Sequence, residues 1–104
     1  MESVMAKVYE LMTLYLVDKC PLSLTNTEIV RFFVENKYTD YFMVQEVIND
    51  IVSKRLLFDI RKEHQTTYFI TDEGKFELNE FGNKIPSAII DEMNRYIQEL
   101  TFLY

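Results

Sequence analysis

Residues 24–52 read LTNTEIVRFFVENKYTDYFMVQEVINDIV, and this stretch decides the fold. Thr25 and Glu28 have the spacing of a capping box, in which a hydroxyl and a carboxylate satisfy each other's exposed backbone donors. One helix is therefore predicted to begin there, and a second to follow a turn near residues 37–38, with Asp40 or the preceding threonine as its cap. Apolar residues recur at helical spacing at Ile29, Phe32, Phe33, Val44, Val47, Ile48, Ile51 and Val52. The stretch therefore predicts two short helices, each with one apolar side.

The flanking sequence predicts one more helix before this stretch and a hairpin and two helices after it. Residues 4–16 carry the wide apolar stripe of a helix buried on more than one side. Residues 57–62 and 67–70 are β-prone and flank the polar tetrapeptide EHQT, a pattern typical of a short hairpin. Residues 71–81 and 85–104 return to helical spacing.

This order of elements predicts a mainly α chain with a small β-hairpin wing, an α+β fold of the winged helix-turn-helix type. The length supports one hydrophobic core, so we expect a single domain over residues 1–104. Within it, residues 3–56 would form a three-helix core and residues 57–70 the wing. Residues 71–104 would form C-terminal helices suited to dimerisation.

Cysteine usage and hydropathy bear on location. Cys20 is the single cysteine, so no intramolecular disulfide can form, and no charged-then-apolar leader opens the sequence. The longest apolar stretch, residues 11–17, is interrupted by Thr13 and is far shorter than a bilayer-spanning helix. We therefore expect a cytoplasmic protein that does not enter a membrane.

The charge balance argues against nucleic acid as a partner. The chain has 11 Lys and Arg against 17 Asp and Glu, a net charge of −6 that repels phosphate. The acidity is uneven, because residues 71–104 hold three basic and seven acidic residues while residues 57–70 are neutral apart from their histidine. The predicted hairpin is therefore less unfavourable for DNA than the C-terminal end.

A family resemblance rests on two segments of the chain. PLSLTNTEIVRFFVENKYTDYFMVQEVINDIVSKRLL, residues 21–57, and TTYFITDEGKFEL, residues 66–78, resemble the winged-helix domains of PadR-like and MarR-like bacterial transcriptional regulators. They are more similar still to an uncharacterised bacterial family of candidate regulators in which LTN, YT.YF and Y.IT..GK..L recur. The resemblance covers roughly residues 5–97. It implies DNA binding by the predicted third helix and the wing, and dimerisation through terminal helices.

The outward side of the third helix supplies candidate DNA readers. These are Thr39, Tyr41, Gln45 and Asn49. Gln45 and Asn49 could pair bidentately with adenine, whereas the two hydroxyls could bind phosphate. Glu46 and Asp50 on the same helix oppose close approach to phosphate, and we expect Phe42 to be a core residue or a hydrophobic staple at the start of the helix. The alternative is an ordinary solvated polar face.

The wing and its flank supply candidate backbone contacts. These are Lys54, Arg55, Arg61, Lys62, His64 and Gln65. By the resemblance, the hairpin tip would lie along the minor groove or the backbone, where basic side chains neutralise phosphates. This is a small footprint, which a dimer on two half-sites would double. The alternative is a solvated charged turn.

The last helix carries an apolar stripe that we expect to pair with a second copy of the chain. Its members are Ile90, Met93, Tyr96, Ile97, Leu100, Leu103 and Tyr104. Aromatic and methionine side chains are enriched at interfaces, and two-fold homodimers are the commonest assemblies. The alternative is that this stripe packs back on residues 4–16 of its own chain.

Catalytic chemistry is not expected. His64 and Cys20 are the single members of their kinds, and they form neither a metal-ligand cluster nor a nucleophile and base pair. No enzyme activity, metal or cofactor is therefore predicted.

The leading hypothesis is a homodimeric transcriptional regulator that binds specific double-stranded DNA. The alternative is a winged-helix module that binds a protein and not DNA. A continuous positive stripe through Lys54, Arg55 and the wing would favour the DNA-binding hypothesis.

Overall fold

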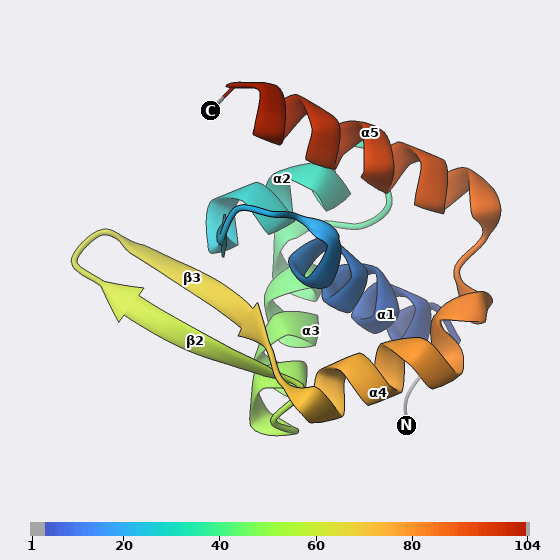
Figure 1. Cartoon of the computed structure of the whole chain (residues 1–104), viewed down its shortest axis with the longest axis horizontal. Helices are drawn as coiled ribbons and strands as arrows, with labels where there is room; N and C mark the ends of the chain where they lie inside the picture. Colours follow the sequence, from blue (N-terminus) through green and yellow to red (C-terminus); the bar gives the residue numbers. More distant parts are fainter. Residues whose placement is uncertain (1–3, 104) are drawn as a thin grey trace.

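The computed structural model describes residues 4–103 and has mainly helices with one small sheet (Figure 1). The elements are α1 (Val4–Lys19), β1 (Leu24–Thr25), α2 (Asn26–Glu35), α3 (Tyr41–Ser53), β2 (Leu57–Lys62), β3 (Gln65–Ile70), α4 (Asp72–Phe81), the 3-10 turn η1 (Gly82–Lys84) and α5 (Ser87–Leu103). The predicted α+β class is confirmed, and the element order is consistent with a winged-helix-like fold. Within residues 4–103, no helix is both long enough and apolar enough to cross a membrane.

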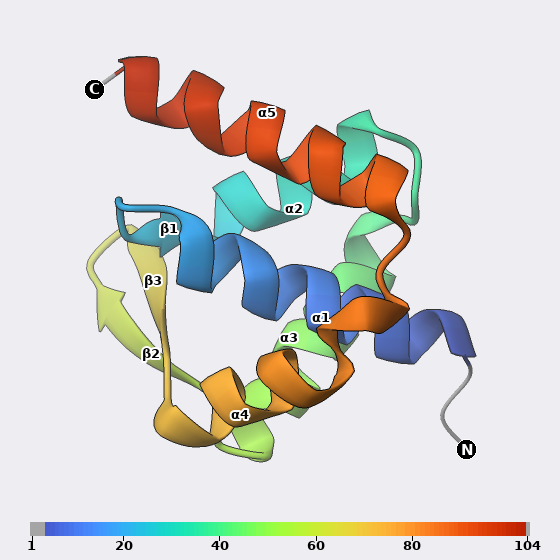
Figure 2. The same cartoon turned by 45° about the vertical axis from the view of Figure 1, so that its right-hand side comes forward.

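Helix α1 lies at the centre of the molecule. In Figure 2 it runs between α5 above and α4 below, with α2 and α3 behind. Every residue from 8 to 14 is buried, including Glu10 and Thr13. A helix covered by neighbours on all sides needs apolar residues around most of its circumference, which explains the wide stripe in its sequence.

The sheet has three antiparallel strands in the order β1-β3-β2. β2 and β3 pair from Leu57 opposite Ile70 to Lys62 opposite Gln65, so the hairpin tip is residues 63–64. The predicted hairpin is confirmed, but its tip is two residues shorter than EHQT because pairing continues through Gln65 and Thr66. The sequence did not indicate β1, since two residues are too few to show an alternating pattern.

The expected caps hold α2 and α3 in place. Thr25 Oγ1 accepts from the Glu28 backbone N–H and Glu28 Oε1 accepts from the Thr25 N–H, which confirms the capping box. Asp40 Oδ1 accepts from the Met43 N–H at 2.9 Å and caps α3. Between the helices the chain turns at Lys37, whose φ of 61° is left-handed.

Helix α4 starts in close contact with the turn that joins α3 to β2. Thr71 Oγ1 accepts from the Gly74 N–H at 2.9 Å and donates toward the carbonyl oxygens of Arg55 and Leu56, at 2.7 and 3.0 Å. A Cβ on Gly74 would lie 2.1 Å from the Leu56 carbonyl oxygen. The glycine of the TDEGK segment is therefore explained by this close approach of two backbones.

Helix α5 packs on its own chain, contrary to the expected role of its apolar stripe. Met93, Ile97 and Leu100 are buried in the protomer core, and the Tyr96 hydroxyl donates to the Glu28 carbonyl oxygen at 2.7 Å. The expectation that these four side chains face a second copy is therefore wrong for this conformation. Their neighbour Ile90 is half-buried against the same core. The side chain of Leu103, and all of Tyr104, lie outside the described residues.

Candidate nucleic-acid interface

A groove separates α3 from the wing tip. It is lined by Thr25, Asn26, Thr27, Gln45, Asn49, Arg61, Lys62, Glu63, His64, Gln65, Thr66 and Tyr68. Six of the predicted DNA contacts are thus brought together, two from the helix and four from the wing. Thr39, Tyr41, Lys54 and Arg55 are not part of its lining. Every lining side chain can donate or accept a hydrogen bond, as binding to a polyanion with polar base edges requires.

Gln45 is already engaged within the chain. Its Nε2 donates to Asn26 Oδ1 at 2.5 Å, while Asn26 Nδ2 donates to Gln45 Oε1 at 3.2 Å and to the Tyr68 hydroxyl at 3.0 Å. This reciprocal pair uses the amide edge that bidentate pairing with adenine would need. In this conformation Gln45 links α3 to Asn26 of α2, which in turn bonds Tyr68 of β3. The exposed amides of the groove are those of Asn49 and Gln65.

The basic residues of the wing differ in how they are partnered. The Arg61 side chain is 82% exposed, and its Nε donates to Asp59 Oδ2 at 2.9 Å. Lys62 and His64 are exposed at the tip. An exposed ion pair of this kind contributes little to stability and can open at low cost. The wing can therefore present Arg61 and Lys62 together to a phosphate backbone.

Lys54 has a structural role inside the protein. Its Nζ lies 3.0 Å from Asp50 Oδ2 and 3.4 Å from Glu10 Oε1. Glu10 is only 2% exposed, and its Oε2 lies 3.5 Å from Lys7 Nζ. Lys7 also pairs with Glu77 of α4 at 2.5 Å. These ion pairs connect α3, α1 and α4 around one buried carboxylate, which would be left uncompensated without its lysines.

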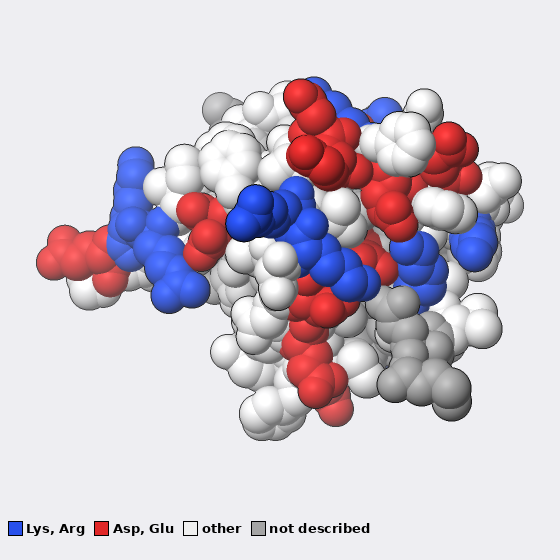
Figure 3. Space-filling view, turned by 90° about the horizontal axis from the view of Figure 1, so that it is seen from below, with Lys and Arg blue, Asp and Glu red and all other residues white. Residues whose placement is uncertain are grey.

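The expected positive stripe is therefore not continuous. Lys54 is paired with acids, and Arg55 occupies a left-handed turn with φ of 64° at the far end of α3 from the groove. In Figure 3 the Lys and Arg atoms of the projecting wing are separated from the next basic group by Asp and Glu atoms. The basic side chains of this surface therefore form separate groups, and the group on the wing is the one that lines the groove.

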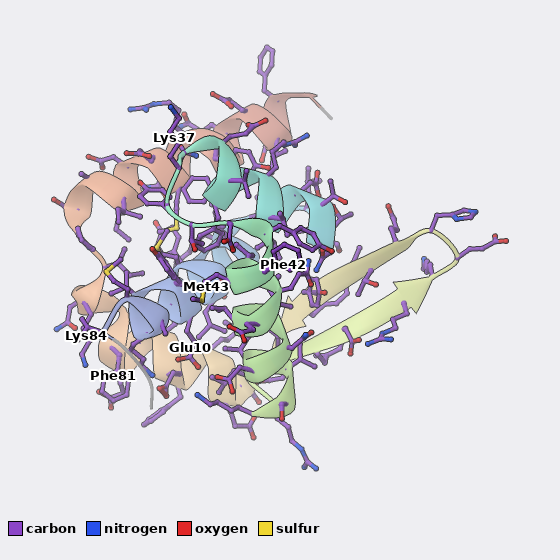
Figure 4. All side chains as sticks on the ribbon, turned by 180° about the vertical axis from the view of Figure 1, so that it is seen from behind. Glu10, Lys37, Phe42, Met43, Phe81 and Lys84 are labelled. Atoms are coloured by element: carbon purple, nitrogen blue, oxygen red, sulfur yellow. The ribbon has the colours of Figure 1, made fainter. Side chains whose placement is uncertain are left out.

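The first turn of α3 exposes three large apolar side chains. Tyr41, Phe42 and Met43 are 53%, 78% and 37% exposed, and the rings of the two aromatics meet edge to face at 5.6 Å. The expectation that Phe42 is a core or staple residue is wrong, because the helical turn gives the inner position to Val44. Figure 4 labels Phe42 and Met43 at this end of α3. Helical spacing alone could have placed Phe42 on the same side of α3 as Asn49, which is seven residues, or two turns, further along.

The turn before α3 is anchored to two other helices. The Tyr38 hydroxyl donates to Glu92 Oε2 of α5 at 2.7 Å, and the Tyr9 hydroxyl of α1 donates to the Tyr38 carbonyl oxygen at 2.8 Å. Burial, with the hydrogen bond to Glu92 and the charge of that carboxylate, raises the pKa of Tyr38 to about 12. The turn before α3 is therefore attached to α1 and to α5 by hydrogen bonds.

The described residues meet the requirements of neither a metal site nor a reactive cysteine. Across residues 4–103, no three His, Cys, Asp or Glu side chains gather in a way that could hold an ion. Cys20 is buried, and burial raises the pKa of its thiol above the usual range, which disfavours the reactive thiolate.

Comparison with known proteins places the chain in a family. No curated protein and no solved structure matches it. One family model does match, over residues 9–102, a span that includes α2 to α4 entirely and most of α1 and α5. The chain belongs to the family described as "Domain of unknown function (DUF4364)".

Proposed function

We propose that this protein is a transcriptional regulator that binds double-stranded DNA with α3 and the wing, as a homodimer. The observation that carries the proposal is the groove between these two elements, where Asn49 faces Arg61, Lys62, His64 and Gln65 across a polar floor. A helix beside a basic hairpin tip can contact base edges and backbone at the same time. The resemblance to bacterial winged-helix regulators supports the same reading.

Each part of the groove would have a different task. The outer side of α3 would enter the major groove, where the amide of Asn49 can pair bidentately with adenine. Arg61 and Lys62 would lie along the backbone or the minor groove and neutralise phosphates. Arg61 would exchange its pair with Asp59 for a phosphate, which is cheap because both side chains are at the surface.

The net charge of −6 sets the conditions under which binding is expected. Two basic side chains per protomer give a weak, salt-sensitive contact, and a symmetric dimer would double it on two half-sites. Because Met93, Ile97 and Leu100 are buried in the protomer, the dimer would use other surfaces of the chain.

A second candidate is a protein-binding module that does not bind DNA. The observation that favours it is the interrupted basic surface. Lys54 forms ion pairs with Glu10 and Asp50 and does not extend a positive stripe. An acidic surface repels DNA but can recruit a basic protein partner.

Selection of bound duplexes from a randomised DNA library at low salt tests the proposal. We expect enrichment of a palindromic sequence, with an affinity that falls steeply as salt rises. Asn49→Ala should relax the selected sequence at one position of each half-site, by about 1–3 kcal/mol of discrimination. Absence of enrichment from folded protein, together with binding that ignores salt, would contradict the proposal and favour the protein-binding module.

A further inference from the structure

We infer that Phe42 reads thymine through its C5-methyl group, so that the DNA site of this protein is specified in part by apolar contact. The inference rests on the proposed function and deepens it. It concerns the first turn of α3, which neither the family description nor the hydrogen-bonding residues of the groove account for.

The first observation is the unpartnered apolar surface of this turn. Phe42 is largely exposed, and its ring meets the ring of Tyr41 edge to face. Met43, the next residue, is also exposed, and Figure 4 labels Phe42 and Met43 at the end of α3 that follows the inter-helix turn. Two exposed aromatic rings in contact mark a contact surface more often than a single exposed apolar residue does.

The second observation is the place of this patch on the proposed interface. Phe42 and Asn49 are two helical turns apart and share the outward side of α3, and Asn49 lines the groove with the wing. When a recognition helix enters the major groove, the residues at its N-terminal end contact the base edges. Phe42 is the second residue of α3, so it would reach the bases first.

The third observation is the lack of an available amide beside it. The pairing edge of Gln45 is used by Asn26, so the exposed side chains of the first two turns of α3 offer apolar contact, the hydroxyl of Tyr41 and the carboxylate of Glu46. Thymine is the one base whose major-groove edge carries a methyl group, and phenylalanine is among the side chains that contact it. Contact with the methyl group of thymine is therefore the base contact that the apolar ring of Phe42 can make.

The experiment uses the selected duplexes, remade with deoxyuridine in place of one thymidine at a time. Uracil keeps the base pair and the hydrogen-bonding edge and removes only the methyl group. We expect one thymine or more in each half-site where this replacement weakens wild-type binding about fourfold, the effect of leaving one methyl group unburied. Phe42→Ala should bind the thymine duplex less tightly and respond to uracil at that position by less than about 1.5-fold.

Phe102→Ala is the matched control, because Phe102 is an almost fully exposed phenylalanine on α5 outside the groove. It should keep the full response to uracil. Wild-type binding that is unchanged by uracil at every position, or a Phe42→Ala variant that keeps the full response, would overturn the inference and leave the proposed function standing. Failure of the wild type to bind any duplex would overturn both.

Discussion

The first turns of α3 and α4 begin alike and differ in what covers them. Asp40 caps α3 by accepting from the Met43 N–H, and Thr71 caps α4 by accepting from the Gly74 N–H, both at 2.9 Å. In α4 the third residue is a glycine pressed against the Leu56 carbonyl, whereas in α3 the first three residues are exposed and apolar. A cap thus fixes where a helix begins, and the tertiary structure decides whether its first turn supports the fold or faces a partner.

Replacing the buried glycine should have the largest effect. In Gly74→Ala the new Cβ would lie 2.1 Å from backbone oxygen, so α4 must move away from Leu56. We expect the free energy of unfolding to fall by about 3 kcal/mol or more in urea denaturation.

Gly82→Ala is the control for that variant. A Cβ there would lie 3.5 Å from Leu78 Cδ1, an ordinary contact, and φ is −60°. Its stability should rise or stay within about 1 kcal/mol of wild type, because alanine restricts only the unfolded chain. Equal losses in the two variants would contradict the close approach of α4 to Leu56.

The contribution of the Tyr38 hydroxyl to stability should be measurable at alkaline pH. The pKa of Tyr38 is raised from 10.0 to about 12, so the folded state keeps a proton that the unfolded state loses above pH 10. Stability from this group is therefore fully present below pH 10 and is lost as pH rises toward 12. Denaturation midpoints measured across this window should fall more steeply for wild type than for Tyr38→Phe. Parallel curves would show that Tyr38 does not carry the difference.

Removal of the Asp40 cap should lower the free energy of unfolding by a moderate amount. Asp40→Ala leaves the Met43 N–H without its side-chain acceptor and should cost about 1 kcal/mol of unfolding free energy. Asp40→Asn, which keeps an acceptor oxygen, should recover most of that loss. If both variants were as stable as wild type, the cap would not contribute to holding the turn.

Replacement of the exposed Phe42 should have the smallest effect on stability. Phe42→Ser removes a large side chain from solvent, so the free energy of unfolding should change by no more than about 0.5 kcal/mol. A loss of several kcal/mol by thermal unfolding would mean that Phe42 is packed in the folded protein, and would remove the contrast with Gly74.

The features that could be predicted from the sequence are local ones. The capping box at Thr25 and Glu28 and the β-prone runs of the wing depend on neighbours in the chain, and the structure has them as expected. The buried stripe of α1 was also evident, because a wide apolar stripe has few alternatives to a central position.

The features that could not be predicted depend on contacts between distant segments. Periodicity identified the apolar side of α5 but not its partner, which proved to be the protomer's own core. Lys54 looked like a phosphate contact because nothing in the local sequence points to the buried Glu10, 44 residues away. Gln45 looked like a base reader for the same reason, since its amide partner Asn26 lies on another helix.

The most direct test of DNA binding by this groove is an affinity titration with two charge reversals. Lys62→Glu alters the groove, and Lys75→Glu makes the same change in net charge at an exposed position of α4 outside it. On the selected duplex, Lys62→Glu should weaken binding about tenfold or more and reduce the salt slope by about 1. Lys75→Glu should stay within about twofold of wild type, because salt screens distant charges. Equal losses in both variants, or none in either, would contradict DNA binding through the wing and α3.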